Sequence, residues 1–265
     1  MTGLNLHPAT ADRNRGTMEF ALAALVIPSG LALGSFLNVV VSRVPLGRSI
    51  VTPGSACRSC ASPIAWYDNI PVVSYVVLRG RCRSCATPIG FTYPLVELLT
   101  ALLLAVSVLT FGLTFDAVLA GAFCAVLVAV SVTDLERRII PNAIVLPAAA
   151  GVLLAQTVLH PSAEWSVAAF GAALFLFIAA VAYPGGMGMG DVKLALVLGA
   201  MLGRSVTVAL MLGLLAALVP AVVLLARHGS AARKMAIPFG PFLAGGGIVA
   251  LFAGERILDA YLTLA

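Results

Sequence analysis

Residues 117–132 read AVLAGAFCAVLVAVSV, and they decide the class of fold. The run contains no charged residue, and Asp134 follows it almost directly. Its length approaches the ~20 apolar residues that carry a helix across the hydrocarbon core of a bilayer. An ionisable side chain at the edge of such a span is energetically unfavourable, so Asp134 is a candidate functional residue.

The composition extends this interpretation to the whole chain. Of the 265 residues, 61% are hydrophobic and only 10% are charged, and the mean hydropathy is +1.06. A soluble domain contains about 25% charged residues. We therefore expect an all-α polytopic membrane protein. The net charge of +5 reflects arginines that fix topology and contact lipid headgroups, and it does not indicate a nucleic-acid partner.

Eight apolar segments are expected to form transmembrane helices. They cover residues 20–42, 94–111, 117–132, 143–159, 165–183, 192–203, 205–226 and 237–253. If the loop 43–93 is cytoplasmic, alternation places twelve of the 16 Lys and Arg residues on that side and four on the other. This bias agrees with the positive-inside rule. We expect an N-terminal tail (1–18), a first span (19–42), a cytoplasmic subdomain (43–93) and a seven-helix part (94–265).

The cytoplasmic subdomain contains two Cys-x-x-Cys pairs separated by 21 residues, namely Cys57, Cys60, Cys82 and Cys85. This spacing is typical of a four-thiolate zinc site, and the cations of Arg58 and Arg83 would favour ionised thiols. Disulfides and a redox motif are alternatives, although a cytoplasmic location disfavours disulfides. We predict a structural zinc site in a small zinc-ribbon-like fold. Residues 72–78 are expected to form a short amphipathic helix or a strand, and Cys124 is expected to pack inside a span.

A second aspartate, Asp191, follows the glycine-rich turn Gly185-Gly186-Met187-Gly188-Met189-Gly190. Glycines allow a sharp turn and a close approach of the backbone to a substrate. With the topology above, Asp134 and Asp191 lie at the same face of the membrane. Two carboxyl groups that share one proton are the catalytic groups of aspartic proteases. The alternatives are a proton-coupled transporter that uses both aspartates, and a noncatalytic scaffold whose zinc site binds a partner.

Several motifs together resemble the bacterial prepilin peptidases, which are membrane proteases of the Gly-x-Gly-Asp type. The resemblance is carried by Gly34-Ser35-Phe36-Leu37-Asn38-Val39-Val40, the paired Cys-x-x-Cys motifs, Tyr93-Pro94-Leu95-Val96-Glu97, Asp134-Leu135, Ile140-Pro141-Asn142 and Gly188-Met189-Gly190-Asp191-Val192-Lys193-Leu194. The order and spacing match over about residues 30 to 200. One departure is Asn142, where many relatives have Asp.

The resemblance implies a bifunctional enzyme of the bacterial cytoplasmic membrane. It would cleave the leader of type IV prepilins or pseudopilins at the cytoplasmic face and then methylate the new N-terminus with S-adenosylmethionine. The resemblance assigns Asp134 and Asp191 as the protease pair, and it associates residues 43–93 and Glu97 with methyl transfer. Relatives without the cysteine loop cleave but do not methylate, so a leader peptidase without methyltransferase activity is the alternative.

Two features of the first spans are expected to be structural. Gly30 and Gly34 have the spacing that permits close packing of transmembrane helices. Asn38 is a buried amide that needs a hydrogen-bond partner within the helical bundle. Glu97 lies near the start of the second span, where an acidic side chain could hold a cationic N-terminus.

Overall fold

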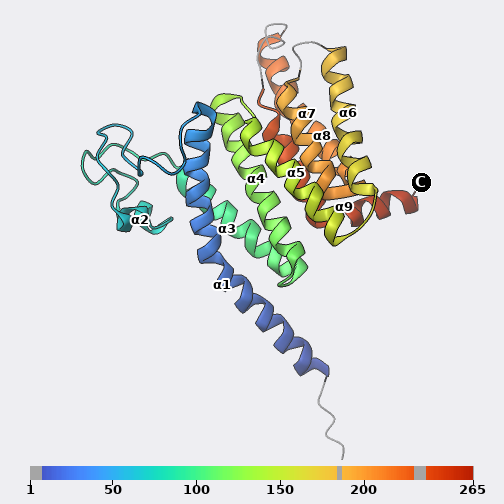
Figure 1. Cartoon of the computed structure of the whole chain (residues 1–265), viewed down its shortest axis with the longest axis horizontal. Helices are drawn as coiled ribbons and strands as arrows, with labels where there is room; N and C mark the ends of the chain where they lie inside the picture. The colour runs from blue at the N-terminus through green and yellow to red at the C-terminus, as the bar shows by residue number, and fades with distance from the viewer. Residues whose placement is uncertain (1–7, 184–186, 230–236, 265) are drawn as a thin grey trace, which may run out of the picture. The chain divides into compact units, whose positions relative to one another are not determined.

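The structure is a computed structural model, and it describes residues 8–183, 187–229 and 237–264. Within these residues it contains helices, turns and two isolated β-bridges, and no strand. This confirms the prediction of an all-α chain. The α-helices, shown in Figure 1, are α1 (Pro8–Arg43), α2 (Val73–Val77), α3 (Thr92–Phe111), α4 (Phe115–Arg137), α5 (Asn142–Leu159), α6 (Glu164–Ala182), α7 (Met189–Leu202), α8 (Val206–His228) and α9 (Gly240–Leu264). Short 3₁₀ turns are η1 (Val44–Leu46), η2 (Trp66–Asn69) and η3 (Gly203–Ser205).

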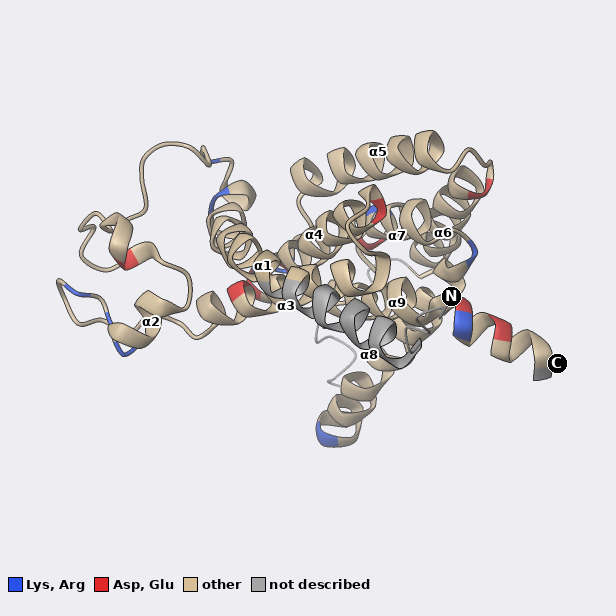
Figure 2. Cartoon of the chain, turned by 90° about the horizontal axis from the view of Figure 1, so that it is seen from below, with Lys and Arg blue, Asp and Glu red and all other residues tan. Residues whose placement is uncertain are grey.

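Seven helical stretches of the described chain are long and apolar enough to cross a membrane. They are Leu25–Leu46, Thr92–Phe111, Phe115–Arg137, Asn142–Leu159, Glu164–Ala182, Met189–His228 and Gly240–Thr263. The expected sixth and seventh spans fall together in the stretch Met189–His228. Within it, η3 separates the 14-residue α7 from α8, at the position where the sequence predicted a break. Charged residues lie mainly at helix ends and in the loop that contains α2 (Figure 2).

The chain divides into two structural units. The first comprises residues 1–38 and 53–122, and the second comprises residues 39–52 and 123–265. The first unit thus contains α3, which the sequence prediction grouped with residues 94–265. The helix α1 begins at Pro8, so it includes part of the segment expected as an N-terminal tail.

Close packing of α1 against α3 organises the first unit. A Cβ atom at Gly34 would lie 2.5 Å from the Cα atom of Glu97, and one at Gly30 would lie 2.5 Å from the Cα atom of Ala101. The two contacts are four residues apart on both helices, which corresponds to one turn. This confirms that Gly30 and Gly34 permit close helix packing. The predicted partner of Asn38 is also found, because its side-chain amide donates a hydrogen bond to the carbonyl oxygen of Tyr93, 3.1 Å away.

The short helix α7 forms the core of the second unit. Most of its side chains are buried, and α5, α6 and α9 pack around it. Gly199 lies against the backbone of Ala168 in α6, where no side chain would fit. Gly246 of α9 makes an equally close approach to the backbone of α8 at Ala209. Helices that surround α7 in this way hold its first residues, including Asp191, in a fixed position.

Candidate active site and metal centre

Asp134 lies within α4, in the last turn of the helix. The sequence placed it just beyond the end of a span, but Leu135, Glu136 and Arg137 continue the helix. The side chain is 6% exposed, and one carboxylate oxygen, Oδ2, accepts a hydrogen bond of 2.9 Å from the backbone N–H of Gly240. Gly240 is the first residue of α9, so the N-terminus of α9 meets the C-terminal turn of α4 at this carboxylate.

Asp191 is the third residue of α7 and is 7% exposed. Its Oδ2 atom accepts a hydrogen bond of 3.2 Å from the N–H of Gly188, and its own N–H donates to the Gly188 carbonyl oxygen. These reciprocal bonds satisfy backbone donors at the start of the helix and orient the carboxylate. Gly185 and Gly186 of the predicted turn lie outside the described residues.

The two aspartates belong to one site. Their carboxyl groups are close enough to interact electrostatically, although 57 positions separate them in the sequence. Ile140, shortly after α4, contacts Gly190 so closely that a Cβ atom at Gly190 would lie 2.8 Å from the Ile140 Cβ atom. The segment that follows Asp134 is thus packed against the residue that precedes Asp191. Two buried carboxyl groups that repel each other electrostatically favour a state in which one of them keeps its proton.

Lys193 lies one turn from the start of α7 and binds Asn142 at the start of α5. Its Nζ atom donates a hydrogen bond of 2.8 Å to Oδ1 of Asn142. The sequence alone did not connect these two residues. It also did not identify Gly240 as a contact of Asp134. The feature that indicates its role is the proline that follows it, Pro241, because proline is common at the start of a helix.

The four predicted cysteine ligands converge in the first unit. The sulfur atoms of Cys57, Cys60, Cys82 and Cys85 all lie within 4.8 Å of one another, and none forms a disulfide. This spacing agrees with a tetrahedral ion bound by four thiolates. The chemistry of the donor set, four sulfurs from two turns, fits zinc.

The two cysteine turns have the same structure. In the first, the Cys57 N–H donates to Ser62 and the Ala61 N–H donates to Cys57. The equivalent bonds of the second turn join Cys82 to Thr87 and Ala86 to Cys82, all with lengths of 2.9 Å. Ala61 and Ala86 both have positive φ, at 58° and 56°. The repeated sequence Cys-Arg-Ser-Cys-Ala therefore forms two equivalent half-sites.

The ionisation of the thiols also favours a metal ion. Hydrogen bonds with the side chain and backbone of Thr87 lower the pKa of Cys85 to about 6. A hydrogen bond with the Ser62 backbone lowers the pKa of Cys60. The neighbouring Cys85 side chain and burial outweigh this effect and raise the pKa of Cys60 to about 11. A cluster in which one thiol ionises readily and its neighbour resists needs a cation before all four sulfurs become thiolates.

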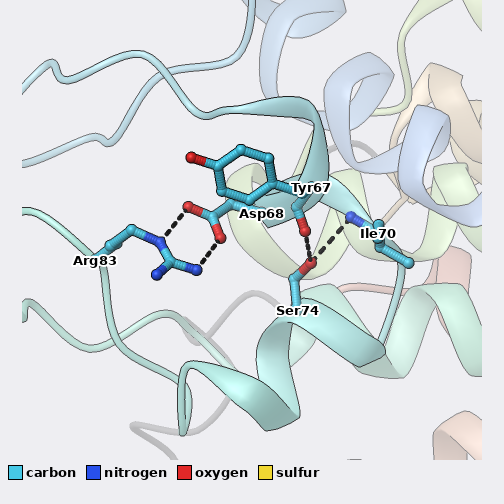
Figure 3. Close-up of polar contacts among 5 residues, drawn as sticks. All are labelled: Tyr67, Asp68, Ile70, Ser74 and Arg83. Carbon is cyan, nitrogen blue, oxygen red and sulfur yellow. Dashed lines mark hydrogen bonds and ion pairs between the residues drawn. The ribbon is translucent and has the colours of Figure 1, made fainter.

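The arginines of the cysteine motifs bind other groups. Arg83 was expected to stabilise the thiolates, but its Nε and Nη2 atoms donate to Asp68 at 2.7 and 2.6 Å, as Figure 3 shows. The guanidinium of Arg58 lies over the Tyr93 ring, 5.6 Å from its centre. The Ser74 hydroxyl donates to the Tyr67 carbonyl oxygen and accepts from the Ile70 N–H, which joins α2 to η2 (Figure 3).

Glu97 occupies a buried position on α3, with 7% exposure. Its Oε2 atom accepts a hydrogen bond of 2.8 Å from the N–H of Val72, and the carboxylate also interacts with the side chains of Ser35 and Asn38. Glu97 therefore connects the cysteine subdomain with α1 and α3. These contacts give the carboxylate a positioning role that the sequence did not predict.

Comparisons with known proteins agree with this division of the chain. Residues 29–111 match the family described as the bacterial peptidase A24 N-terminal domain, and residues 121–226 match the type IV leader peptidase family. A protein of Bacillus subtilis (strain 168) is 36% identical over 244 residues, which cover 89% of this chain and 96% of the relative. A protein of Pseudomonas aeruginosa is 36% identical over 283 residues, which cover 94% and 95% of the two chains.

A third similar protein, from Myxococcus xanthus, is 43% identical over 137 residues, which cover 51% of this chain and 40% of the relative. All three are named prepilin leader peptidase/N-methyltransferase. No solved structure matches the chain significantly. Both family domains match, and the relatives from Bacillus subtilis and Pseudomonas aeruginosa are covered almost entirely. With seven candidate membrane spans, these matches lead to one conclusion: the chain belongs to the type IV leader peptidase family, and it is a multi-pass membrane protein.

Proposed function

We propose that this protein is an aspartic endopeptidase that removes the leader of type IV prepilins or pseudopilins and then methylates the new N-terminus. The observation that supports the proposal is that Asp134 and Asp191 are both buried in the second unit and close enough to interact electrostatically. The names of the relatives, which join peptidase and N-methyltransferase, support both activities.

The peptidase step follows from the shared proton of the two aspartates. The ionised carboxylate takes a proton from water as the water oxygen attacks the scissile carbonyl carbon. The protonated partner donates its proton to the carbonyl oxygen, which gives a tetrahedral diol. The first carboxyl group then passes the proton taken from water to the amide nitrogen, the C–N bond breaks with release of the amine, and a diol hydroxyl returns a proton to the partner as the new carboxyl group forms. The N–H groups of Gly188 and Gly240 each hold one carboxylate oxygen, and the second oxygen of each aspartate would act on water or substrate.

The methyl-transfer activity is assigned to the first unit. Cys57, Cys60, Cys82 and Cys85 would hold a structural zinc ion that fixes the subdomain. S-adenosylmethionine supplies an electrophilic methyl group. Glu97 is the residue that we associate with this activity, because it joins the cysteine subdomain to α1 and α3. The distribution of Lys and Arg supports a cytoplasmic location for the subdomain and for both aspartates.

The test uses the purified full-length protein with a prepilin peptide and isotopically labelled S-adenosylmethionine. Leader cleavage is expected to disappear in Asp134→Asn and in Asp191→Asn, because either change removes the shared proton. Asp259→Asn, which alters an exposed acid of α9, serves as the matched control and should cleave normally. Full activity of both active-site variants would leave only the scaffold or transporter hypothesis.

The second activity is tested in the same assay. Incorporation of the labelled methyl group into the cleaved peptide should depend on Cys57, whereas cleavage should not. A Cys57→Ser protein that cleaves but does not methylate assigns the two reactions to different parts of the chain. Absence of methylation in the unmodified protein would favour a leader peptidase without methyltransferase activity.

A further inference from the structure

The helix α2 exposes an apolar face. Val73, Val76 and Val77 are 53%, 67% and 68% exposed. Their spacing of three and four residues places them on one side of the helix. The adjoining side carries Ser74, which is 8% exposed and bonded to Tyr67 and Ile70 (Figure 3). The helix is therefore amphipathic, with its polar contacts turned inward and its valines turned outward.

Two contacts fix the position of α2 beside the start of α3. The N–H of Val72 binds Glu97, and the Tyr75 ring meets the edge of the Phe91 ring with their centres 6.4 Å apart. Phe91 directly precedes α3, and Glu97 lies in its second turn. At 1.5 Å per residue, the two anchor points are about 9 Å apart along the helix axis. The first two turns of a span lie at the headgroup layer and the adjacent hydrocarbon, so α2 lies at the same depth.

The residues on both sides of α2 are typical of a membrane interface. Trp66, in the η2 turn that packs against α2, is 80% exposed. Tryptophan is enriched where hydrocarbon meets headgroups. Arg79 and Arg81 follow α2 directly, and both are exposed. Arginines at this level attract anionic lipid headgroups.

The connection into α2 is held in an unusual conformation. Val72 has a φ of 61°, which a β-branched residue rarely adopts. Such a conformation persists only where surrounding contacts enforce it. Here the contact is the hydrogen bond from the Val72 N–H to Glu97, a residue of the span itself. This contact thus fixes the position of α2 along α3.

From these observations we propose that α2 is an interfacial helix, which inserts Val73, Val76 and Val77 into the phospholipid surface and docks the cysteine subdomain on the membrane. The occupant of the apolar face is lipid because lipid surrounds a span at this depth, and because Trp66 precedes the helix and two arginines follow it. An amphipathic segment binds an interface through its buried apolar area and through attraction to anionic lipids. The proposal concerns the cysteine subdomain alone, and it does not depend on peptidase activity.

A tryptophan reporter tests the contact directly. We would introduce Val76→Trp into a protein that also carries Trp66→Phe and Trp165→Phe, and place it in nanodiscs of phosphatidylcholine and phosphatidylglycerol. Lipids brominated near the headgroup should quench most of the emission, and lipids brominated deep in the acyl chains should quench less. Emission typical of water and insensitive to both lipids would overturn the proposal. Emission that is shielded from water but quenched by neither lipid would mean that the apolar face contacts protein. This outcome would also overturn the proposal.

A second experiment measures docking by proteolysis in the same nanodiscs. Trypsin cleaves after Arg79 and Arg81, which a docked helix shields. The combined change of Val73, Val76 and Val77 to Asn should accelerate this cleavage several-fold. Two control proteins should be cleaved at the original rate. One has the same three positions changed to Leu, and the other carries Val51→Asn, a change of an exposed valine outside α2. Equal rates for the Asn and Leu proteins would contradict membrane docking. The zinc content of each protein shows whether the subdomain stays folded. If the Asn protein loses zinc, the Val76→Trp quenching experiment alone tests the proposal.

Discussion

At the scale of single residues, Gly240 has the closest contact with the candidate active site. Its N–H binds Asp134, and its Cα approaches so closely that a Cβ atom would lie 2.9 Å from the same carboxylate oxygen. Any side chain at this position displaces the carboxylate. A displacement of about 1 Å can reduce the rate of an enzyme by ~100-fold.

We therefore expect Gly240→Ala to reduce leader cleavage by roughly 10-fold or more, because the added methyl group displaces the carboxylate of Asp134. Methylation of a pre-cleaved peptide should be unchanged, since that activity is assigned to the first unit. Gly245→Ala in the same helix is the control, because a Cβ atom there meets no other atom within 4 Å. Equal loss in both variants would point to a general weakness of α9 instead.

Asp68 gives the cysteine subdomain a pH dependence. The hydrogen bond from Arg83 lowers the pKa of Asp68 below its ordinary value of 3.8. A carboxyl group whose pKa is lower in the folded state stabilises the fold above its ordinary pKa, and this contribution disappears as the pH falls through the lowered value.

We expect Asp68→Asn to lower the urea midpoint of the subdomain at neutral pH, with Trp66 fluorescence in a Trp165→Phe protein as the readout. The difference between the two proteins should be constant down to about pH 4 and should shrink at lower pH. Comparison of two proteins at each pH removes the effect of acid on the thiolates. A difference that grows on acidification would contradict the ion pair as its source.

The aspartates could be predicted from the sequence, whereas Gly240 could not. Asp134 and Asp191 stand out because a charge at the edge of an apolar span is unfavourable unless it has a function. Gly240 lies among other glycines of the last span, where close helix packing explains a glycine equally well. Its contact depends on where α9 begins relative to α4, and only the tertiary structure determines that.

At the scale of elements, the α1–α3 contact depends on the absence of side chains at Gly30 and Gly34. Without a hydrophobic driving force between helices in lipid, such contacts depend on close van der Waals packing. The Gly34 contact also involves the backbone of Glu97, which holds the cysteine subdomain through Val72. Separation of these helices therefore disturbs the anchor of α2.

For this reason we expect Gly34→Leu to destabilise the first unit by about 1–3 kcal/mol, the usual result of overpacking. A thermal unfolding curve with Trp66 as probe would show the lower midpoint. Gly151→Ala in α5, where a Cβ atom meets no neighbour within 4 Å, should leave the curve unchanged. A tolerated Gly34→Leu would show that the two helices can move apart freely.

Short elements were the hardest to predict. Residues 72–78 could form a helix or a strand, because seven residues with alternating and helical periodicity are ambiguous. Hydrogen bonds of Ser74 to the η2 turn select the helix in the structure. The spans between the first and the last were predicted to within a few residues at their ends, since their apolar runs are unambiguous. The first and last spans had larger errors, because α1 begins at Pro8 and α9 continues to Leu264, whereas the expected spans covered residues 20–42 and 237–253. The cysteine ligands were predicted from spacing alone, but the Asp68–Arg83 pair required the folded subdomain.

At the scale of the whole molecule, the candidate metal site and the candidate aspartate pair lie in separate structural units. Each unit has its own packed helices, so damage to one need not reach the other. The family domains that match residues 29–111 and 121–226 follow the same division.

Metal removal should therefore separate the two activities. We expect a chelator, or Cys57→Ser, to unfold residues 53–90 and to abolish methyl transfer, because a subdomain of this size requires its metal to fold. Leader cleavage should keep most of its rate. Asp191→Asn gives the reciprocal control, with methylation of a pre-cleaved peptide intact. Parallel loss of both activities in either experiment would mean that the units work as one.

The length of α7 has a consequence for where peptide hydrolysis takes place. Its 14 residues extend about 21 Å, whereas the hydrocarbon region measures ~30 Å. When η3 lies at one headgroup layer, the opposite end of α7, with Asp191, stops roughly 9 Å short of the other layer. With that placement, the scissile bond would have to descend below the lipid surface to reach Asp191. A bilayer with longer acyl chains would increase this depth, and we then expect a leader to reach the aspartates less readily.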